Sequence, residues 1–394
     1  MTTAEAPTPV LSQELLDGCA ARAAGYDKEN RFFSEDFEAL KQAGYLKLAV
    51  PKEFGGLGMS VAELCREQRR LAYHAPATAL AVNMHLYWTV LAASMRAMGD
   101  PSTEWMLEEA GKGEIFAAGH SESGNDLVGM ASTTRAERVD GGYRFYGHKN
   151  FGSLTPVWTR LGLHAQDNDD PTGPKIVHAF MPRDTDGFRV VETWDTLGMR
   201  ASRSDDTILD GAFVPDRYIA SVTPVGFAGA NLFVLCLFGA AEPTISSVYL
   251  GIAERLRDLA VTSAQKKTSL ALGGKPMAYN PMIEYIVAEI GMEVEAMAAH
   301  LERIADDWSR GVDHGMAWPL KLVAMKYRVT EGARRVGKLA LDVVGGGGIF
   351  KGQEFERLLR DVTLGTIHPA NSPLAHEVVG KSLLGTLGQE PRWG

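Results

Sequence analysis

Two long apolar stripes in the second half of the chain constrain its fold more than any other feature. The first runs through Ile283, Ile286, Val287, Ile290, Val294, Met297, Leu301 and Ile304. The second runs through Leu322, Met325, Val329, Ala333, Val336 and Ala340. A repeat of three to four residues marks the buried face of a helix. Two such helices in succession, which we expect to be antiparallel, indicate a helical bundle.

The residues before this bundle change character once. Between residues 11 and about 113 the apolar spacing is helical, and a glycine-rich turn ends at Ser60, a residue suited to capping the next helix. Between 116 and 223 the alternation predicts strands, and Asp140-Gly141-Gly142 is typical of a hairpin turn. We therefore predict an N-terminal α-helical domain (1–115), a middle β domain (116–223) and a C-terminal helical bundle (224–394).

Charge and composition restrict the partners. The 394 residues carry a net charge of −9, which argues against nucleic acid or an anionic membrane surface. The three cysteines lack metal-ligand spacing, and we expect no metal. We see no signal peptide, and the most apolar stretch, residues 232–241, is short for a membrane span. The expected location is the cytoplasm.

The last fifty residues contain a run of four glycines, Gly345–Gly348, followed by Arg360-Asp361 and His368-Pro369. Glycine lets the backbone approach another group closely, and exposed backbone N–H groups bind anions such as phosphate. Taken alone, a glycine helix cap with a flexible turn explains the run at least as well.

Five motifs, in this order, resemble the acyl-CoA dehydrogenase superfamily over nearly the whole chain. They are Pro51–Gly58, Ser121-Glu122 with Asn125-Asp126, Gly147–Ser153, Leu197–Ser202, and Gly345–Gly348 with Arg360-Asp361. The resemblance implies a mostly α fold with a helical N-terminal domain, a β-barrel-like middle domain and a C-terminal four-helix bundle. It also implies a flavin between the β domain and the bundle, and a homotetramer or at least a dimer.

The resemblance also implies which residues hold the flavin. Ser121, Phe151 and Ser153 would contact the isoalloxazine ring, with Ser153 near N5, although core packing alone would also explain Phe151. Lys266 stands where the family has an arginine on the flavin pyrophosphate, and the longer loop after it leaves FMN open beside FAD. Gly345, Gly346 and Gly347 would lie against the flavin tail of a neighbouring subunit.

The chain departs from the family at the catalytic base. Most members have a glutamate nine residues after the arginine of the Arg-Asp pair, where this chain has Pro369. A minority have it at the start of a helix, at about Leu232 here, and neither position is glutamate. His368, beside Pro369, can titrate near neutral pH and could act as acid or base.

The spacing of Arg360-Asp361, His368 and His376-Glu377 resembles a flavin monooxygenase branch that lacks the glutamate, which includes dibenzothiophene monooxygenase and amino-sugar nitrososynthases. That branch takes reduced flavin from a separate reductase and forms a flavin C4a-hydroperoxide. The resemblance places His368, Asn125 and Ser153 around the C4a–N5 edge, and His85 on the opposite wall. Packing on a helix face explains His85 equally well.

We therefore expect a flavin-dependent oxidoreductase that oxygenates a small organic substrate. The alternative is an acyl-CoA dehydrogenase that desaturates an acyl-CoA thioester with a relocated base. A flavin-binding protein without catalysis is the third interpretation.

Overall fold

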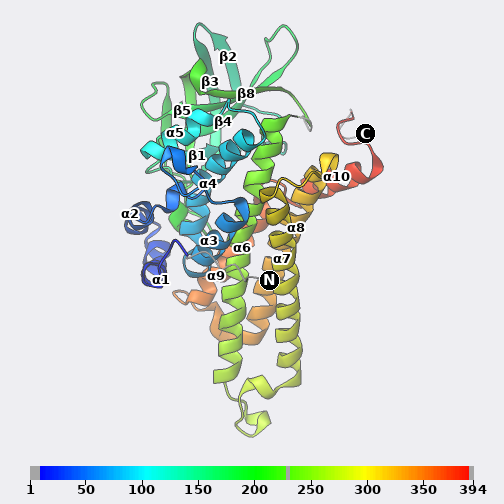
Figure 1. Ribbon diagram of the computed structural model, residues 1–394. Coiled ribbons are helices and arrows are strands. Elements are labelled where there is room, and N and C mark those ends of the chain that lie inside the picture. The colour runs from blue at the N-terminus through cyan, green and yellow to red at the C-terminus, as the bar shows by residue number, and fades with distance from the viewer. Residues whose placement is uncertain (1–8, 228–230, 390–394) are drawn as a thin grey trace.

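The computed structural model describes residues 9–227 and 231–389, and Figure 1 shows a β domain at one end and long helices at the other. The first helices are α1 (Gln13–Glu29), α2 (Ser34–Gln42), α3 (Val61–His74), α4 (Pro76–Ala97) and α5 (Glu104–Lys112). The later ones are α6 (Leu232–Lys266), α7 (Pro281–Ser309), α8 (Trp318–Val344), α9 (Glu354–Thr363) and α10 (Ser372–Leu384). Helices, strands and helices follow one another, which confirms the predicted fold class.

The strands form one sheet in the part of the chain that the structure describes. They are β1 (Phe116–Gly119), β2 (Arg135–Val139), β3 (Gly142–Gly152), β4 (Arg160–Asp167), β5 (Lys175–Pro182), β6 (Phe188–Val191), β7 (Asp205–Pro215) and β8 (Ile219–Pro224). Their order is β6-β7-β3-β2-β4-β5-β8, and β1 pairs in parallel with β4. The β2–β3 hairpin turns at Gly141 in a left-handed conformation, as its sequence predicts.

The bundle is built on α6, α7 and α8, and the predicted stripes of α7 and α8 lie mostly on their buried faces. The α6–α7 connection, with short 3₁₀ turns at Leu270–Leu272 and Met277–Tyr279, is the far tip of the molecule in Figure 1. Helix α6 has 35 residues, and the apolar stretch 232–241 forms its first turns. By length and composition it could cross a membrane, but 78% of its most apolar window is buried inside the protein, as in a core helix.

Local signals set the helix starts. Ser60 caps α3 through a capping box with Glu63, because each side chain bonds the other residue's backbone N–H. In the glycine-rich turn before Ser60, a Cβ at Gly56 would lie 2.1 Å from the Val50 carbonyl oxygen, so a side chain cannot fit there.

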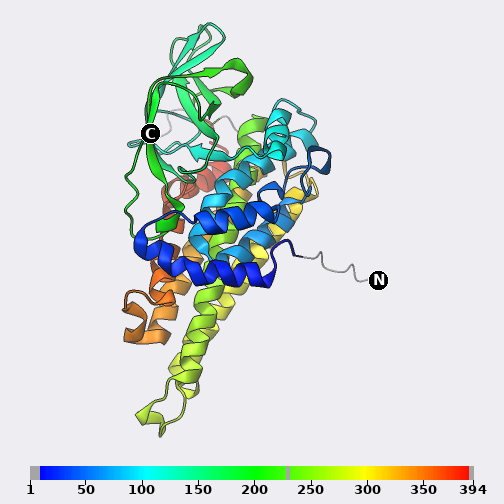
Figure 2. The same ribbon diagram turned by 90° about the vertical axis from the view of Figure 1, so that its left-hand side faces the viewer.

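The helical layer lies beside the β domain (Figure 2), and α4 and β4 pack closely where the two meet, along a seam. Trp88 of α4 is buried there, and its indole N–H donates to the Ala117 carbonyl at 3.0 Å. A Cβ on Gly162 of β4 would lie 2.7 Å from the Trp88 ring, so this glycine lets the helix approach the strand. The seam leads into a cavity between the β domain and the bundle.

Candidate active site

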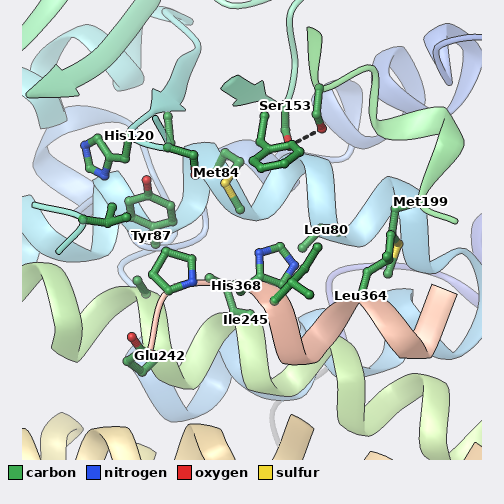
Figure 3. A pocket seen from close by; sticks show the side chains of 18 of the residues that line it. Leu80, Met84, Tyr87, His120, Ser153, Met199, Glu242, Ile245, Leu364 and His368 are labelled. Atoms are coloured by element: carbon green, nitrogen blue, oxygen red, sulfur yellow. Dashed lines mark hydrogen bonds between the residues drawn. The ribbon is translucent and has the colours of Figure 1, made fainter. Parts of the chain in front are cut away.

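The central cavity lies where α4, α6, the ends of several strands and the loop after α9 converge (Figure 3). Its wall is mostly apolar, as in many small-molecule sites. The polar side chains on it include those of His120, Ser121, Ser153, Ser204, Glu242 and His368. The cavity thus brings together four residues that the sequence predicted for the site: Ser121, Phe151, Ser153 and His368.

Phe151 and Ser153 present two different chemistries to the cavity. Phe151 is 53% exposed, so core packing does not account for it, and its ring meets Trp194 edge-on at 5.8 Å. Ser153 is buried, and its Oγ lies 2.7 Å from the Ser204 Oγ, which lies 2.7 Å from the Ser202 Oγ. A relay of hydroxyls therefore ends at the cavity, where Ser153 can donate or accept.

Backbone strain gathers around the same cavity. Phe151 and Met199, which line it, have φ of 59° and 54°. Leu154 and Ala370, one residue beyond cavity residues Ser153 and Pro369, have φ of 65° and 56°. Side-chain-bearing residues rarely adopt this left-handed region, and such strain clusters at functional sites.

His368 follows the 3₁₀ turn Leu364–Ile367 and is held on both sides. Its Nε2 lies 2.7 Å from the Tyr249 hydroxyl, and its carbonyl accepts from the Lys326 ammonium at 3.1 Å. Burial, and then the charge of Lys326, lower the pKa of His368 to about 3. Burial raises the pKa of Tyr249 well above its usual value, so that its hydroxyl keeps its proton. His368 is therefore a neutral imidazole in a fixed orientation, and it does not titrate near neutral pH as the sequence alone suggested.

Glu242 of α6 is a cavity residue that the sequence reasoning missed. It is 3% exposed, and its Oε2 has no hydrogen-bond partner among the described residues. Burial raises the pKa of Glu242 to about 8 against the opposing charge of Lys326. The resemblance places a glutamate on this helix only at its start, near Leu232. Glu242 lies about three turns further along the same helix. The Glu242-Pro243 pair that interrupts the apolar run was the available signal.

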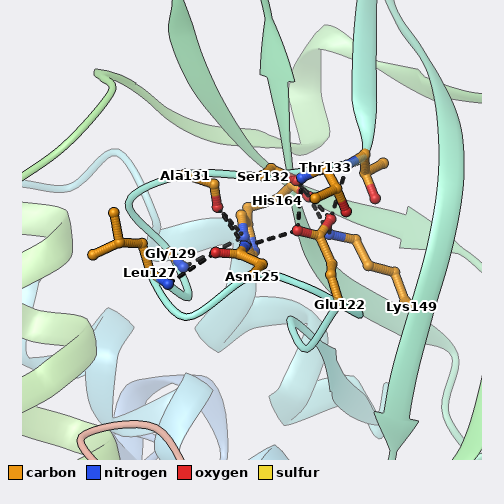
Figure 4. Close-up of polar contacts among 10 residues, drawn as sticks. Glu122, Asn125, Leu127, Gly129, Ala131, Ser132, Thr133, Lys149 and His164 are labelled. Atoms are coloured by element: carbon orange, nitrogen blue, oxygen red, sulfur yellow. Dashed lines mark hydrogen bonds and ion pairs between the residues drawn. The ribbon is translucent and has the colours of Figure 1, made fainter. Parts of the chain in front are cut away.

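The loop between β1 and β2 is organised by a buried ion pair (Figure 4). The Lys149 Nζ lies 2.5 Å from the Glu122 Oε1, and the two side chains are 1% and 0% exposed. Glu122 also accepts from the Ser132 hydroxyl at 2.6 Å and from the Thr133 N–H at 2.9 Å. Burial alone would raise the pKa of Glu122, but Lys149 and these bonds lower it to about 2. The pair fixes the strand-end geometry that carries Ser121 and Phe151.

Two family models match the chain, the acyl-CoA dehydrogenase N-terminal domain over residues 13–100 and the C-terminal domain over residues 243–373. Together they span more than half of the chain. The chain belongs to the acyl-CoA dehydrogenase superfamily.

The relatives of this superfamily member include proteins named as acyl-CoA dehydrogenases and proteins named as nitrososynthases. It is 28% identical over 377 residues to the putative acyl-CoA dehydrogenase YdbM of Bacillus subtilis, covering 93% of both chains. It is also 28% identical to the amino sugar nitrososynthase DnmZ of Streptomyces peucetius, covering 92% of this chain and 89% of that one. The structure of KijD3 in complex with FMN and a dTDP-keto-amino sugar superposes with a TM-score of 0.82 at 25% identity, covering 95% and 92%. The superfamily member is accordingly a flavin-dependent oxidoreductase.

The cavity fits a flavin. Phe151 offers an exposed aromatic face, Ser121 and Ser153 offer hydroxyls, and Glu242 and His120 each have a buried polar atom without a partner among the described residues. Phe151, Ser121 and Ser153 are the residues that would hold the ring within this subunit. A bound flavin would supply the two-electron chemistry that no side chain provides.

The geometry does not support the predicted catalytic role of His85. His85 is 1% exposed in the core, its Nε2 lies 2.7 Å from the Leu46 carbonyl, and its Nδ1 accepts from the Phe116 N–H at 3.1 Å. Both ring nitrogens are thus bonded to backbone, and the side chain does not line the cavity. These contacts agree with the alternative interpretation, a histidine packed on a helix face.

Asn125 lies in the Figure 4 loop and outside the cavity wall. Its amide nitrogen donates to Glu122 and to the Ala131 carbonyl, both at 2.8 Å, while its oxygen accepts from the Leu127 N–H at 2.9 Å. All of its polar atoms are therefore used to shape the loop. The geometry does not support a direct catalytic or cofactor contact for this residue.

Lys266 and the glycine run lie at the other end of α6 and α8. Lys266 is exposed, and the neighbouring Lys267 ammonium contacts the Val344 carbonyl beside Gly345. A Cβ on Gly345 or Gly346 would meet nothing within 4 Å of its own chain. The predicted contact with the flavin of a neighbouring subunit stays a prediction.

Proposed function

We propose that this flavoenzyme oxygenates a small organic substrate, using reduced flavin and dioxygen. The observation that supports the proposal is His368, a neutral imidazole fixed on the cavity wall beside Pro369, where most of the family has a glutamate base. The loop from Leu364 to Asn371 contains no carboxylate. Proton handling on this side of the cavity is therefore left to an uncharged group.

Each polar residue has a defined task in this proposal. His368 can donate at one nitrogen and accept at the other, so it can pass a proton to or from an oxygen atom near the ring. Ser153, backed by Ser204, donates or accepts at the ring edge. The apolar wall, which includes Leu80, Met84 and Leu237, keeps bulk water away from the oxygen chemistry.

The proposal also includes a reductase partner, a homotetrameric assembly, and either FMN or FAD as the flavin. Reduced flavin would come from a separate reductase, and the assembly would be a homotetramer. FMN is as acceptable as FAD, because the arginine expected at the pyrophosphate is replaced by Lys266 and KijD3 was solved with FMN.

Stopped-flow mixing of the protein, loaded with reduced FMN or FAD, with dioxygen tests the proposal. We expect a transient absorbance band that belongs to neither the reduced nor the oxidised flavin, and no anaerobic bleaching by acyl-CoA thioesters. Direct reoxidation without a transient, together with anaerobic bleaching by an acyl-CoA, would reverse the order of the two candidate functions.

Glu242 favours a second candidate function, acyl-CoA dehydrogenation. Its unpartnered Oε2 on the cavity wall could remove a proton next to a thioester carbonyl, and a raised pKa suits a weakly acidic C–H group. Glu242→Gln keeps the shape and removes the base. In a dehydrogenase this change should abolish anaerobic flavin reduction by acyl-CoA without loss of flavin, whereas in an oxygenase the oxygen transient should persist.

A further inference from the structure

Three histidines lie together at the seam, behind or on the cavity wall. His164 of β4 and His178 of β5 are directly opposite each other in the antiparallel register, with ring centroids 6.1 Å apart. His120, which follows β1 and lines the cavity, lies 5.1 Å from the His164 ring. No group of side chains in the described part of the chain has the arrangement of a metal site, so this cluster needs another explanation.

The cluster is short of hydrogen-bond partners. His164 uses only its Nε2, which lies 3.0 Å from the Ala131 carbonyl. The Nδ1 of His164, both nitrogens of His178 and the Nε2 of His120 are buried without a partner among the described residues. Buried polar atoms are nearly always satisfied, so four such atoms in one cluster require an explanation.

The surroundings keep His120 neutral. Burial first, and then the proximity of His178 and Lys149, lower the pKa of His120 to about 3. A neutral imidazole has one N–H and one lone pair. The Lys149 charge, which also lowers the pKa of His120, favours a lone pair on whichever ring nitrogen lies nearer to it. The Nε2 is the buried nitrogen, whereas Nδ1 is not among the buried unpartnered atoms. Nδ1 is therefore left to carry the hydrogen on the accessible side of the ring, where His120 lines the cavity.

We propose that His120 is a ligand-binding residue of the cavity, which donates a hydrogen bond from Nδ1 to a carbonyl-type oxygen of the bound molecule. That oxygen belongs either to the flavin or to the substrate. The proposal rests on the cavity being the flavin site, and it holds for either of the two candidate reactions. The His120 ring packs between His164 and Trp88. Its centroid lies 5.1 Å from the His164 ring and 5.2 Å from the Trp88 ring, which it meets edge-on.

Three substitutions at His120 separate the donor from simple packing. Asn places an N–H near the position of Nδ1, Gln places one near Nε2, and Leu keeps bulk without a donor. Binding of FMN and FAD is followed by flavin fluorescence, and binding of butyryl-CoA, which has a carbonyl, by its perturbation of the bound flavin spectrum. Thermal unfolding of each variant checks the fold.

If the acceptor is on the flavin, His120→Leu and His120→Gln should weaken flavin binding about fivefold to tenfold, and His120→Asn should restore most of it. If the acceptor is on the substrate, flavin binding should be unchanged and the same pattern should appear for butyryl-CoA.

Two outcomes overturn the proposal: equal binding of both probes by His120→Leu and the parent, or equal weakening in all three variants. Should the Leu variant fail to fold, equal binding by the Asn and Gln variants overturns it as well. A parent protein that binds neither FMN nor FAD would instead overturn the proposed function.

Discussion

At the scale of single residues, the cavity combines fixed neutral groups with one carboxylate. His368 is oriented by Tyr249 and Lys326, and Ser153 is oriented by Ser204. Each therefore presents one defined atom to the cavity, which reduces the reorganisation needed during a reaction.

Replacement of His368 by Ala should reduce turnover by roughly 100-fold or more, the usual contribution of a positioned acid or base. Steady-state turnover with reduced flavin and oxygen measures the loss. His148→Ala is a matched control, because His148 is half exposed and pairs with Asp206 outside the cavity. Near parental turnover in the His368 variant would remove this residue from the mechanism.

Ser153→Ala should shift the reduction potential of the bound flavin, because a hydrogen bond at the ring stabilises one oxidation state more than the other. The loss of one bond is on the order of 1 kcal/mol, or roughly 20 mV for a two-electron couple. Dye-equilibrium titration measures the potential, and Ser153→Thr, which keeps a hydroxyl, should restore most of it. An unchanged potential in the Ala variant would place Ser153 away from the ring.

The sequence predicted some of these residues and not others, for physical reasons. Ser121, Phe151 and Ser153 stand in motifs that resemble the family, and His368 stands beside the family's base position, so the resemblance pointed to residues that line one cavity. His85 could not be assigned from spacing, because only the fold reveals that Leu46 and Phe116 occupy its two nitrogens. Glu242 was missed because the glutamate was expected at the start of α6, and Glu242 lies about three turns inside the helix. Helical periodicity does not identify which turn of a helix meets a cavity.

At the scale of elements, local structure was easier to predict than the pairing of strands. The helix stripes and the hairpin at Gly141 were predictable, because each reflects periodicity or turn chemistry within a few residues. The eight-strand order and the β1–β4 parallel pairing were not, since they depend on contacts far apart in sequence.

The Glu122–Lys149 pair should be a strong link between the β1–β2 loop and β3. Glu122→Gln alone should cost about 3–5 kcal/mol of unfolding free energy, since it leaves the buried Lys149 without its counter-charge. The double variant Glu122→Gln with Lys149→Met should lose clearly less than the sum of the two single losses. Urea unfolding measures these values, and strict additivity would show that the two side chains do not interact.

At the scale of the whole molecule, burial of neutral histidines couples stability to pH. The pKa of His120, His178 and His368 is lowered to about 3 in each case, mainly by burial. Folded protein therefore binds fewer protons than unfolded protein once the pH falls below about 6.5, the ordinary histidine value.

The melting temperature should consequently fall as the pH drops from 6.5 toward 3, because the stability present above the unfolded pKa is lost on the way to the folded pKa. Each histidine contributes a slope of about 1.4 kcal/mol per pH unit at most. Calorimetry across this range should show a smaller slope for His178→Leu than for the parent. Identical slopes would indicate that His178 is protonated in the folded state.

The glycine run offers a test of assembly. Gly346→Leu meets no atom of its own chain within 4 Å at Cβ, so the subunit should fold with an unchanged melting temperature. If a neighbouring subunit's flavin tail lies there, as predicted, flavin occupancy should nevertheless fall. Unchanged absorbance at the flavin bands would separate the glycine run from the cofactor site.

Helix α6 carries Glu242 near one end and Lys266 and Lys267 at the other, about 36 Å apart at 1.5 Å per residue. A single continuous rod therefore sets the spacing between the reacting cavity and the glycine run. Inserting one residue between them would rotate one end by about 100° relative to the other, so that only one could keep its contacts. Helix α6 therefore fixes the distance between the two sites. Differences in substrate between members of the superfamily would then fall to the loops that line the cavity.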